Sequence, residues 1–285
     1  MSGAVDLVRG ITRIASLPEV VLRLEETLAD PRANFADFSR IIAEDSALSA
    51  RLLRIVNSGF YQFPQRIETI SAAITVIGTR QLHALVQASS IMRLFDGISS
   101  ELVDMERFWR HSIGCGTLAR AIATQRRSSN VERYYVLGLL HDIGRLILFV
   151  ERPQQAAAAT VLVEERGLML FEAEYEVFGF DHGAVTRALL ESWKLPASLS
   201  EPAALHHAPL RARKYAEDSA VIHLADIMAH TLHYGTSGEL RVPPLVPAAW
   251  DALGLAISQL QSVVEHADRQ YHDAVELFMP GKDES

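Results

Sequence analysis

Apolar residues recur at spacings of three and four along almost the whole chain, as in Val21, Leu24 and Leu28. This spacing places them on one face of an α-helix, whereas a half-buried strand alternates apolar and polar residues. The best candidate for a strand, residues 161–163, lies within an alanine-rich helical context. We therefore predict an all-α fold, a multi-helix bundle made of two packed helical lobes.

Capping residues, prolines and glycines mark where the predicted helices begin and end. A second helix is expected to begin at Asn34 or Asp37 and to stop near Asp45. The other predicted helices span residues 18–28, 46–56, 72–77, 79–94, 101–124, 134–150, 153–166, 172–178, 183–193, 203–207, 216–233 and 247–277. The break at residues 96–100 is the expected seam between an N-terminal lobe, residues 1–98, and a C-terminal lobe, residues 99–285.

Charge and cysteine content exclude several classes of function. The net charge is −8, so we expect no direct nucleic-acid partner, because such binding needs a basic surface. The single cysteine, Cys115, cannot form an internal disulfide, which fits a reducing cytoplasm. The most apolar long stretch, residues 136–150, is interrupted by charged residues and is too short to span a bilayer. With no recognisable signal peptide, we expect a cytoplasmic protein without a membrane segment.

Residues 57–64 place three aromatic side chains, Phe60, Tyr61 and Phe63, in a loop between helices. Aromatic residues are enriched where protein partners dock, so the loop is a candidate surface for a signalling partner. The other interpretation is that these rings pack at the junction between the two lobes.

The pair His141-Asp142 interrupts a strongly apolar segment, residues 138–146. Each of these polar side chains must find a partner or lose the free energy of its hydration. A metal ion and a dense polar network are both remedies, and the residues alone leave the two open. An Asp next to a His can bridge two ions, and two such ions would activate a water molecule and hold a phosphate.

The C-terminal lobe contains further residues of the types that bind Fe, Mn, Zn or Mg. The candidate metal ligands, for one or two divalent ions, are His111, His141, Asp142, His182, His206, His207 and Asp226. We assign five other histidines to structure or surface, namely His83, His230, His233, His266 and His272.

Residues 140–145, Leu-His-Asp-Ile-Gly-Arg, resemble the signature of the HD superfamily, whose members are helical metal-dependent phosphohydrolases. The match extends upstream to His111, at the position of the family's first histidine, and downstream to Asp226, at its last aspartate. His182 and the pair His206-His207 resemble the additional histidines of the HD-GYP branch, which cleaves cyclic dinucleotides. The resemblance implies an HD-like helical bundle with a metal site.

An ordered set of further motifs resembles the narrower HDOD family. The set lies within residues 17–226 and comprises residues 17–20, 41–48, 52–58, 67–74, 77–78, 181–184, 189–196 and 206–209. This resemblance implies a bacterial signalling or response-regulator output module with a protein signalling partner and without a generally established catalytic activity.

Two functions of different classes remain open. The first is a non-catalytic signalling module whose C-lobe site is structural, metal-filled or ligand-sensing. The second is a metal-dependent phosphohydrolase acting on a nucleotide or phosphoester. There, His182 and His206 or His207 would hold a second metal, and Arg145 would contact phosphate. Ala208-Pro209 follows His207 where the HD-GYP branch has an acidic, glycine-rich stretch, so cyclic-di-GMP is not an expected substrate. Residues that would act in catalysis stay unassigned, and no organic cofactor is expected.

Overall fold

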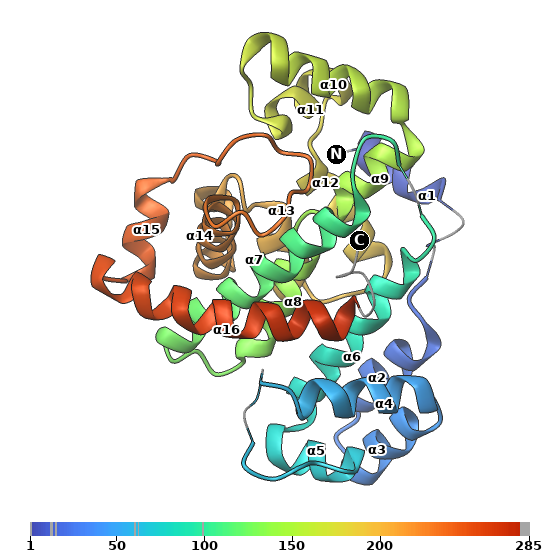
Figure 1. The fold of residues 1–285 in the computed structure, drawn as a ribbon. Helices are drawn as coiled ribbons and strands as arrows, with labels where there is room; N and C mark the ends of the chain where they lie inside the picture. The colour runs from blue at the N-terminus through green and yellow to red at the C-terminus, as the bar shows by residue number, and fades with distance from the viewer. Residues whose placement is uncertain are drawn as a thin grey trace.

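The computed structural model describes residues 2–11, 14, 16–59, 61, 63–98 and 100–279. Helices make up most of this part of the chain (Figure 1). Within it, the β-type pairing is limited to an isolated bridge between Ser100 and Val103. The prediction of an all-α fold is therefore confirmed. None of the helices in the described ranges is both long enough and apolar enough to cross a membrane.

In the described ranges, six α-helices precede the predicted seam. These are α1 (Ser2–Arg9), α2 (Glu19–Ala29), α3 (Phe35–Ala43), α4 (Ser46–Val56), α5 (Ile70–Ile77) and α6 (Thr79–Leu94). The following elements come after it: α7 (Met105–Gln125), α8 (Val131–Leu140), α9 (Ile143–Glu151), α10 (Pro153–Arg166), α11 (Leu170–Phe178), α12 (His182–Ser192), α13 (Ala197–Ala204), η1 (Pro209–Arg211), α14 (Ala216–Thr231), α15 (Pro247–Leu253), η2 (Ile257–Gln259) and α16 (Leu260–Phe278).

The single helix predicted over residues 134–150 is wrong. Two helices, α8 and α9, cover this range, and the two residues His141 and Asp142 form the turn between them. Both helices are buried on almost every side, so the apolar pattern does not mark the place where one ends. The polar pair itself is the break, because its side chains turn towards other helices.

Other elements also differ from the predictions. Helix α13 ends at Ala204, where the sequence predicted a helix over residues 203–207. The helix predicted over residues 247–277 is divided into α15, η2 and α16. Gly254 ends α15 in the left-handed conformation, with φ of 63°, which glycine adopts without a steric penalty. Helix α1 was not predicted.

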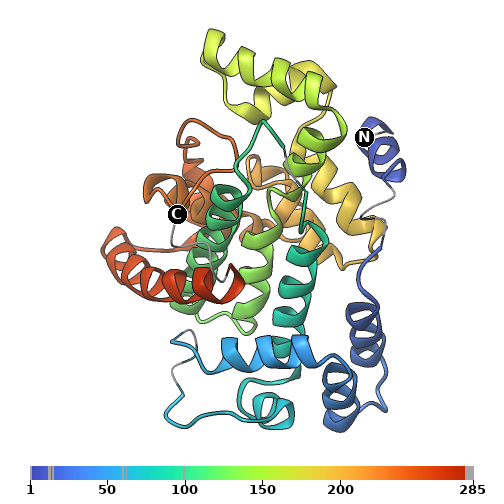
Figure 2. The same ribbon diagram turned by 45° about the vertical axis from the view of Figure 1, so that its right-hand side comes forward.

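Helix α7 is central, because it packs against α8, α14 and α16. Helices α2 to α5 form one end of the molecule, and α6 runs from them along α8 (Figures 1 and 2). The hairpin of α10 and α11 projects at the opposite end. Helix α1 packs on α12 of the second lobe, and nearby the Trp193 indole donates a hydrogen bond to the Ile14 carbonyl at 3.0 Å. The lobe boundary after residue 98 remains a proposal.

Tyr61, in the loop of residues 57–64, links segments on the two sides of the predicted seam. Its hydroxyl donates to a carboxylate oxygen of Glu132 on α8 at 2.9 Å, and the same oxygen accepts from Arg120 at 3.0 Å. The Tyr61 ring stacks on Phe63 with 5.7 Å between centroids. Phe60 lies outside the described residues. These contacts favour a packing role at the lobe junction for Tyr61 and Phe63.

We expect Tyr61→Phe to lower the free energy of unfolding by about 1.5–3 kcal/mol, the usual contribution of a hydrogen bond to a charged group. Glu132 is only 2% exposed, so water cannot replace the lost hydroxyl easily. Urea unfolding measures the change, with Tyr175→Phe as the control, because Tyr175 is 63% exposed. A Tyr61→Phe midpoint equal to that of the control would contradict this role.

Candidate metal centre

Five segments that are distant in the sequence bring the predicted site residues together. The candidate ligands lie on α7 (His111), in the turn between α8 and α9 (His141 and Asp142), at the start of α12 (His182), after α13 (His206 and His207) and on α14 (Asp226). Six of the seven are at most 2% exposed, and His207 is partly exposed. The cluster is thus an interior feature of the helices from α7 to α14.

The first half of the cluster contains His111, His141 and Asp226, whose ligand atoms all lie within 4.8 Å of one another. The Asp226 Oδ1 is 3.1 Å from the His111 Nε2 and 3.5 Å from the His141 Nε2. Two imidazole nitrogens and a carboxylate oxygen therefore surround one point, which is a donor set suited to a divalent ion.

The second half contains Asp142, His182, His206 and His207, again within 4.8 Å of one another. The Asp142 Oδ1 lies 3.0 Å from the His182 Nε2 and 3.5 Å from the His206 Nε2. This half contains three imidazoles and one carboxylate, so it also matches the ligand preferences of Fe, Zn or Mn.

Asp142 belongs to both halves. Its Oδ2 lies 3.3 Å from the His141 Nε2 and 3.9 Å from the His111 Nε2, while its Oδ1 faces His182 and His206. One carboxylate thus presents one oxygen to each half, which is the arrangement by which an aspartate can bridge two ions.

The imidazoles are oriented by hydrogen bonds on their outer nitrogens. The Nδ1 of His141 lies 2.6 Å from the Gly138 carbonyl, and the Nδ1 of His206 lies 2.7 Å from the Ala203 carbonyl. A carbonyl only accepts, so Nδ1 carries the proton and the Nε2 lone pair points into the cluster. The Nδ1 of His182 lies 2.6 Å from a Glu174 carboxylate oxygen. This outer support of ligating histidines is typical of metal sites.

Several inner atoms of the cluster have no hydrogen-bond partner among the described residues. They are the Nε2 atoms of His111, His141 and His207, the Oδ1 of Asp142 and the Oδ1 of Asp226. Leaving a buried polar atom unsatisfied costs about 1–3 kcal/mol. Because these atoms are mainly acceptors that face one another, a cation satisfies them together. The buried cluster could therefore bind a metal, and its residues fit one.

The protonation states agree with this chemistry. Burial lowers the pKa of His111 to about 4 despite the neighbouring Asp226 carboxylate, so its imidazole is neutral and able to ligate. Burial opposes ionisation of Asp142, but the charges of Arg145 and His141 outweigh it and hold the pKa of Asp142 well below the ordinary range. Burial also opposes a charge on His141, yet the neighbouring Asp142 raises its pKa well above the ordinary value. The carboxylates thus favour positive charge at this point, and an ion that bound here would displace the proton from the His141 Nε2, because a ligating imidazole is neutral.

His230, which the sequence assigned to structure or surface, lies beside the cluster. Its Nε2 lies 3.3 Å from the Asp226 Oδ1, and its ring centroid is 4.4 Å from that of His111. The signal was present in the sequence, because His230 follows Asp226 by four residues and therefore shares its helix face. Glu174 was also missed, and nothing in the sequence pattern marks it, since the α10–α11 hairpin brings it to His182 from another part of the fold.

Arg145 does not have the environment expected of a phosphate contact. It is 1% exposed, and its guanidinium donates to Glu174 at 3.1 Å, to Asp142 at 3.3 Å and to Ser237 at 2.6 Å. These partners, all inside the protein, accept the hydrogen bonds of the Arg145 guanidinium in place of a phosphate. We therefore replace the predicted phosphate contact with a proposed positioning role, in which Arg145 fixes the carboxylates of Asp142 and Glu174.

A family model, the HDOD domain, matches residues 14–209. A curated relative, an uncharacterized protein of Treponema pallidum, is 24% identical over 205 residues, which are 72% of this chain and 39% of the relative. The chain thus spans about two fifths of that relative's length.

Solved structures share the fold. An HDOD domain protein of unknown function from Geobacter sulfurreducens superposes with a TM-score of 0.79 at 24% identity, covering 98% of this chain and 99% of the other. A protein named "putative phosphohydrolase" from Shewanella amazonensis gives a TM-score of 0.74 at 21% identity, covering 95% and 98%. The match of the family model over more than half of the residues, together with this shared fold, shows that the chain belongs to the HDOD family.

Proposed function

We propose that this protein is a regulatory module of bacterial signal transduction, acting in the cytoplasm through a protein partner, and that its buried cluster holds divalent metal without hydrolysing a substrate. The observation that carries the proposal is the enclosure of the cluster. Six of its seven candidate ligands are at most 2% exposed, whereas a catalytic metal keeps an open coordination position that substrate can reach. The internal partners of Arg145 remove a phosphate-binding group as well.

In this proposal the ligands act as a cross-link between helices. His111, His141, Asp142 and Asp226, supported by His230, would hold one ion, and Asp142, His182, His206 and His207 a second. The bound ion supplies the positive charge that the facing carboxylates and imidazole lone pairs require. The imidazole-rich donor set favours Fe, Zn or Mn over Mg. The proposed effect of the bound metal is to fix α7, α12 and α14 around the turn that contains Asp142.

We expect protein purified without chelator to carry about one to two transition-metal ions per chain, as a two-halved site allows. Elemental analysis by mass spectrometry measures the content. Stripping the metal should lower the melting temperature, because an ion that binds only the folded state stabilises it. Protein that carries no transition metal, and whose melting temperature does not rise when Fe, Zn or Mn is added, would count against the metal.

The alternative is a metal-dependent phosphohydrolase for a nucleotide or phosphoester, and the bridging position of Asp142 favours it. A panel of phosphatase and phosphodiesterase substrates separates the two functions. We expect no turnover by the metal-loaded protein, including none of cyclic-di-GMP. Turnover that disappears in Asp142→Ala would replace the signalling module with the enzyme.

A further inference from the structure

A cavity lies where α4, α6, the start of α7 and the last turn of α16 meet. Its volume is about 320 Å³, at the lower end of the range of small-molecule pockets. Its floor is apolar and includes Met92, Phe95 and Trp109, which are at most 7% exposed. The elements around it come from both lobes, since α4 and α6 precede the seam and α16 follows it.

Three arginines gather at this cavity. Arg51 and Arg54 lie one turn apart on α4, and Arg93 lies on α6. The Arg51 guanidinium donates to the Ser89 hydroxyl at 2.9 Å. Arg54 and Arg93 are exposed, and their guanidiniums form no hydrogen bond or ion pair with any residue that the structure describes. Burial and the positive charges of Arg93 and Arg54 lower the pKa of Arg51, with Asp96 and Asp45 opposing them.

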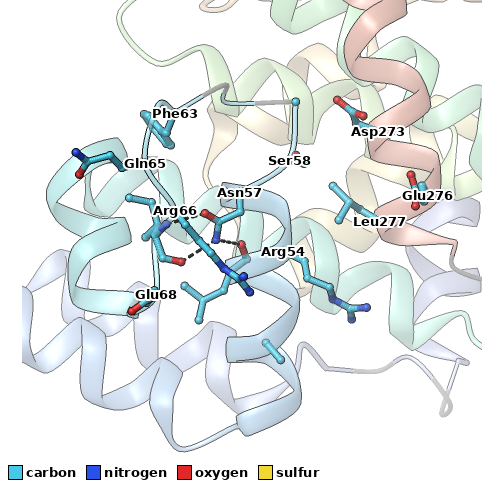
Figure 3. Close-up of a pocket in the computed structure, with 14 residues that line it drawn as sticks. Arg54, Asn57, Ser58, Phe63, Gln65, Arg66, Glu68, Asp273, Glu276 and Leu277 are labelled. Carbon is cyan, nitrogen blue, oxygen red and sulfur yellow. Dashed lines mark hydrogen bonds between the residues drawn. The ribbon is translucent and has the colours of Figure 1, made fainter.

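The balance of charge at the cavity is positive. Asp96 is the one acidic side chain among the described residues that line it, so three guanidiniums face one carboxylate. A larger neighbouring cavity of about 1240 Å³ shares Arg54 and Leu277 with it but also has Asp273 and Glu276 on its wall. Figure 3 shows Arg54 extending away from Arg66 and Asn57, on the side of the end of α16. Because its wall carries both positive and negative side chains, the larger cavity is the poorer anion site.

We propose that the smaller cavity binds a small phosphate monoester that carries an aromatic ring, of the nucleoside monophosphate class. The planar guanidiniums of Arg54 and Arg93 suit the phosphate oxygens, which arginine can contact with two parallel hydrogen bonds. The ring lies on the apolar floor beside Met92 and Phe95. A ligand in this place touches α4, α6 and α16 together, so it holds the two lobes in one arrangement. The inference does not depend on the metal centre.

Isothermal titration calorimetry of the full chain tests the proposal with AMP and GMP, with adenosine and guanosine, and with inorganic phosphate. We expect a nucleoside monophosphate to bind at least about 10-fold more tightly than inorganic phosphate or either nucleoside, because the site combines both kinds of contact. The double variant Arg54→Gln/Arg93→Gln should weaken that binding at least about 10-fold. Its melting temperature without ligand should stay unchanged, because both side chains are exposed.

Arg211→Gln is the matched control, since Arg211 is an exposed arginine on η1 outside the cavity, and it should bind as the unchanged protein does. Absence of binding by every phosphate compound overturns the proposal. So does equal binding by the double variant and the control. If inorganic phosphate bound as tightly as AMP and GMP, the apolar floor would not contribute to binding, and the proposed contact of the ring with it would be wrong.

Discussion

Asp142→Ala is expected to empty both halves of the metal centre at once. Asp142 is the residue that presents one oxygen to each half, at 3.0 Å from the His182 Nε2 and 3.3 Å from the His141 Nε2. Its removal also takes a carboxylate away from the buried Arg145 guanidinium. Breaking a buried charge pair by deleting one partner costs about 3–5 kcal/mol. We therefore expect metal content to fall to background and the unfolding free energy to fall by about this amount.

Asp142→Asn separates the loss of charge from the loss of shape. The amide keeps the volume of the side chain but cannot bridge two cations as a carboxylate does, so we expect at least about a 100-fold loss of metal affinity. Elemental analysis and competition with a chelator measure both variants. Asp251→Asn, at an exposed position on α15, is the matched control and should retain its metal. A soluble Asp142→Ala protein with the metal content of the control would show that Asp142 does not hold the metal.

The helical fold was predictable because its signal is local. Apolar spacing and capping residues act within a few positions of the chain, so most helices appear close to their predicted ranges. The break between α8 and α9 was not predictable from that pattern, because helices buried on all sides lack the polar face that gives a helix its period. The sequence showed that the pair His141-Asp142 is a polar interruption of an apolar segment, but it did not show that the pair forms a turn.

The gathering of the candidate ligands followed from their residue types and from the resemblance to a known family, whereas their supports depend on tertiary contacts. His230 follows Asp226 by four residues, a spacing that places both on one face of a helix. Glu174 has no such spacing. It reaches His182 at 2.6 Å only because the α10–α11 hairpin returns to α12. Likewise, the internal partners of Arg145 include Ser237, which is 92 residues away in the chain.

Gly144→Ala is the second change for which we expect a large effect. Helix α9 approaches α12 so closely that a Cβ at Gly144 would lie 2.5 Å from the Thr186 backbone nitrogen and would also clash with the His182 carbonyl. Backbone atoms cannot move aside as the end of a flexible side chain does, so the two helices must separate. Overpacking of a core costs about 1–3 kcal/mol and in some cases more. We expect about 3 kcal/mol here, because both clashes involve backbone.

The separation of α9 from α12 should weaken the half of the metal centre that contains His182. Helix α12 begins with His182, and the Thr186 hydroxyl accepts from the Gly144 N–H at 3.0 Å and donates to the His141 carbonyl at 3.1 Å. A displaced α12 therefore takes His182 away from Asp142, while His111 and Asp226 stay in place on α7 and α14. We expect Gly144→Ala to lose the ion of the second half before that of the first, which elemental analysis and stepwise chelation can resolve.

Two comparisons make the result of Gly144→Ala interpretable. Gly10→Ala adds the same methyl group where the nearest atom is 3.4 Å away, so its unfolding free energy should change by no more than about 0.5 kcal/mol. Thr186→Val removes both hydrogen bonds without adding a clash, so it should destabilise the protein less than Gly144→Ala does. Gly144→Ala could unfold at the same urea concentration as Gly10→Ala and keep its full metal content. That result would contradict the claim that the close contact between α9 and α12 positions His182.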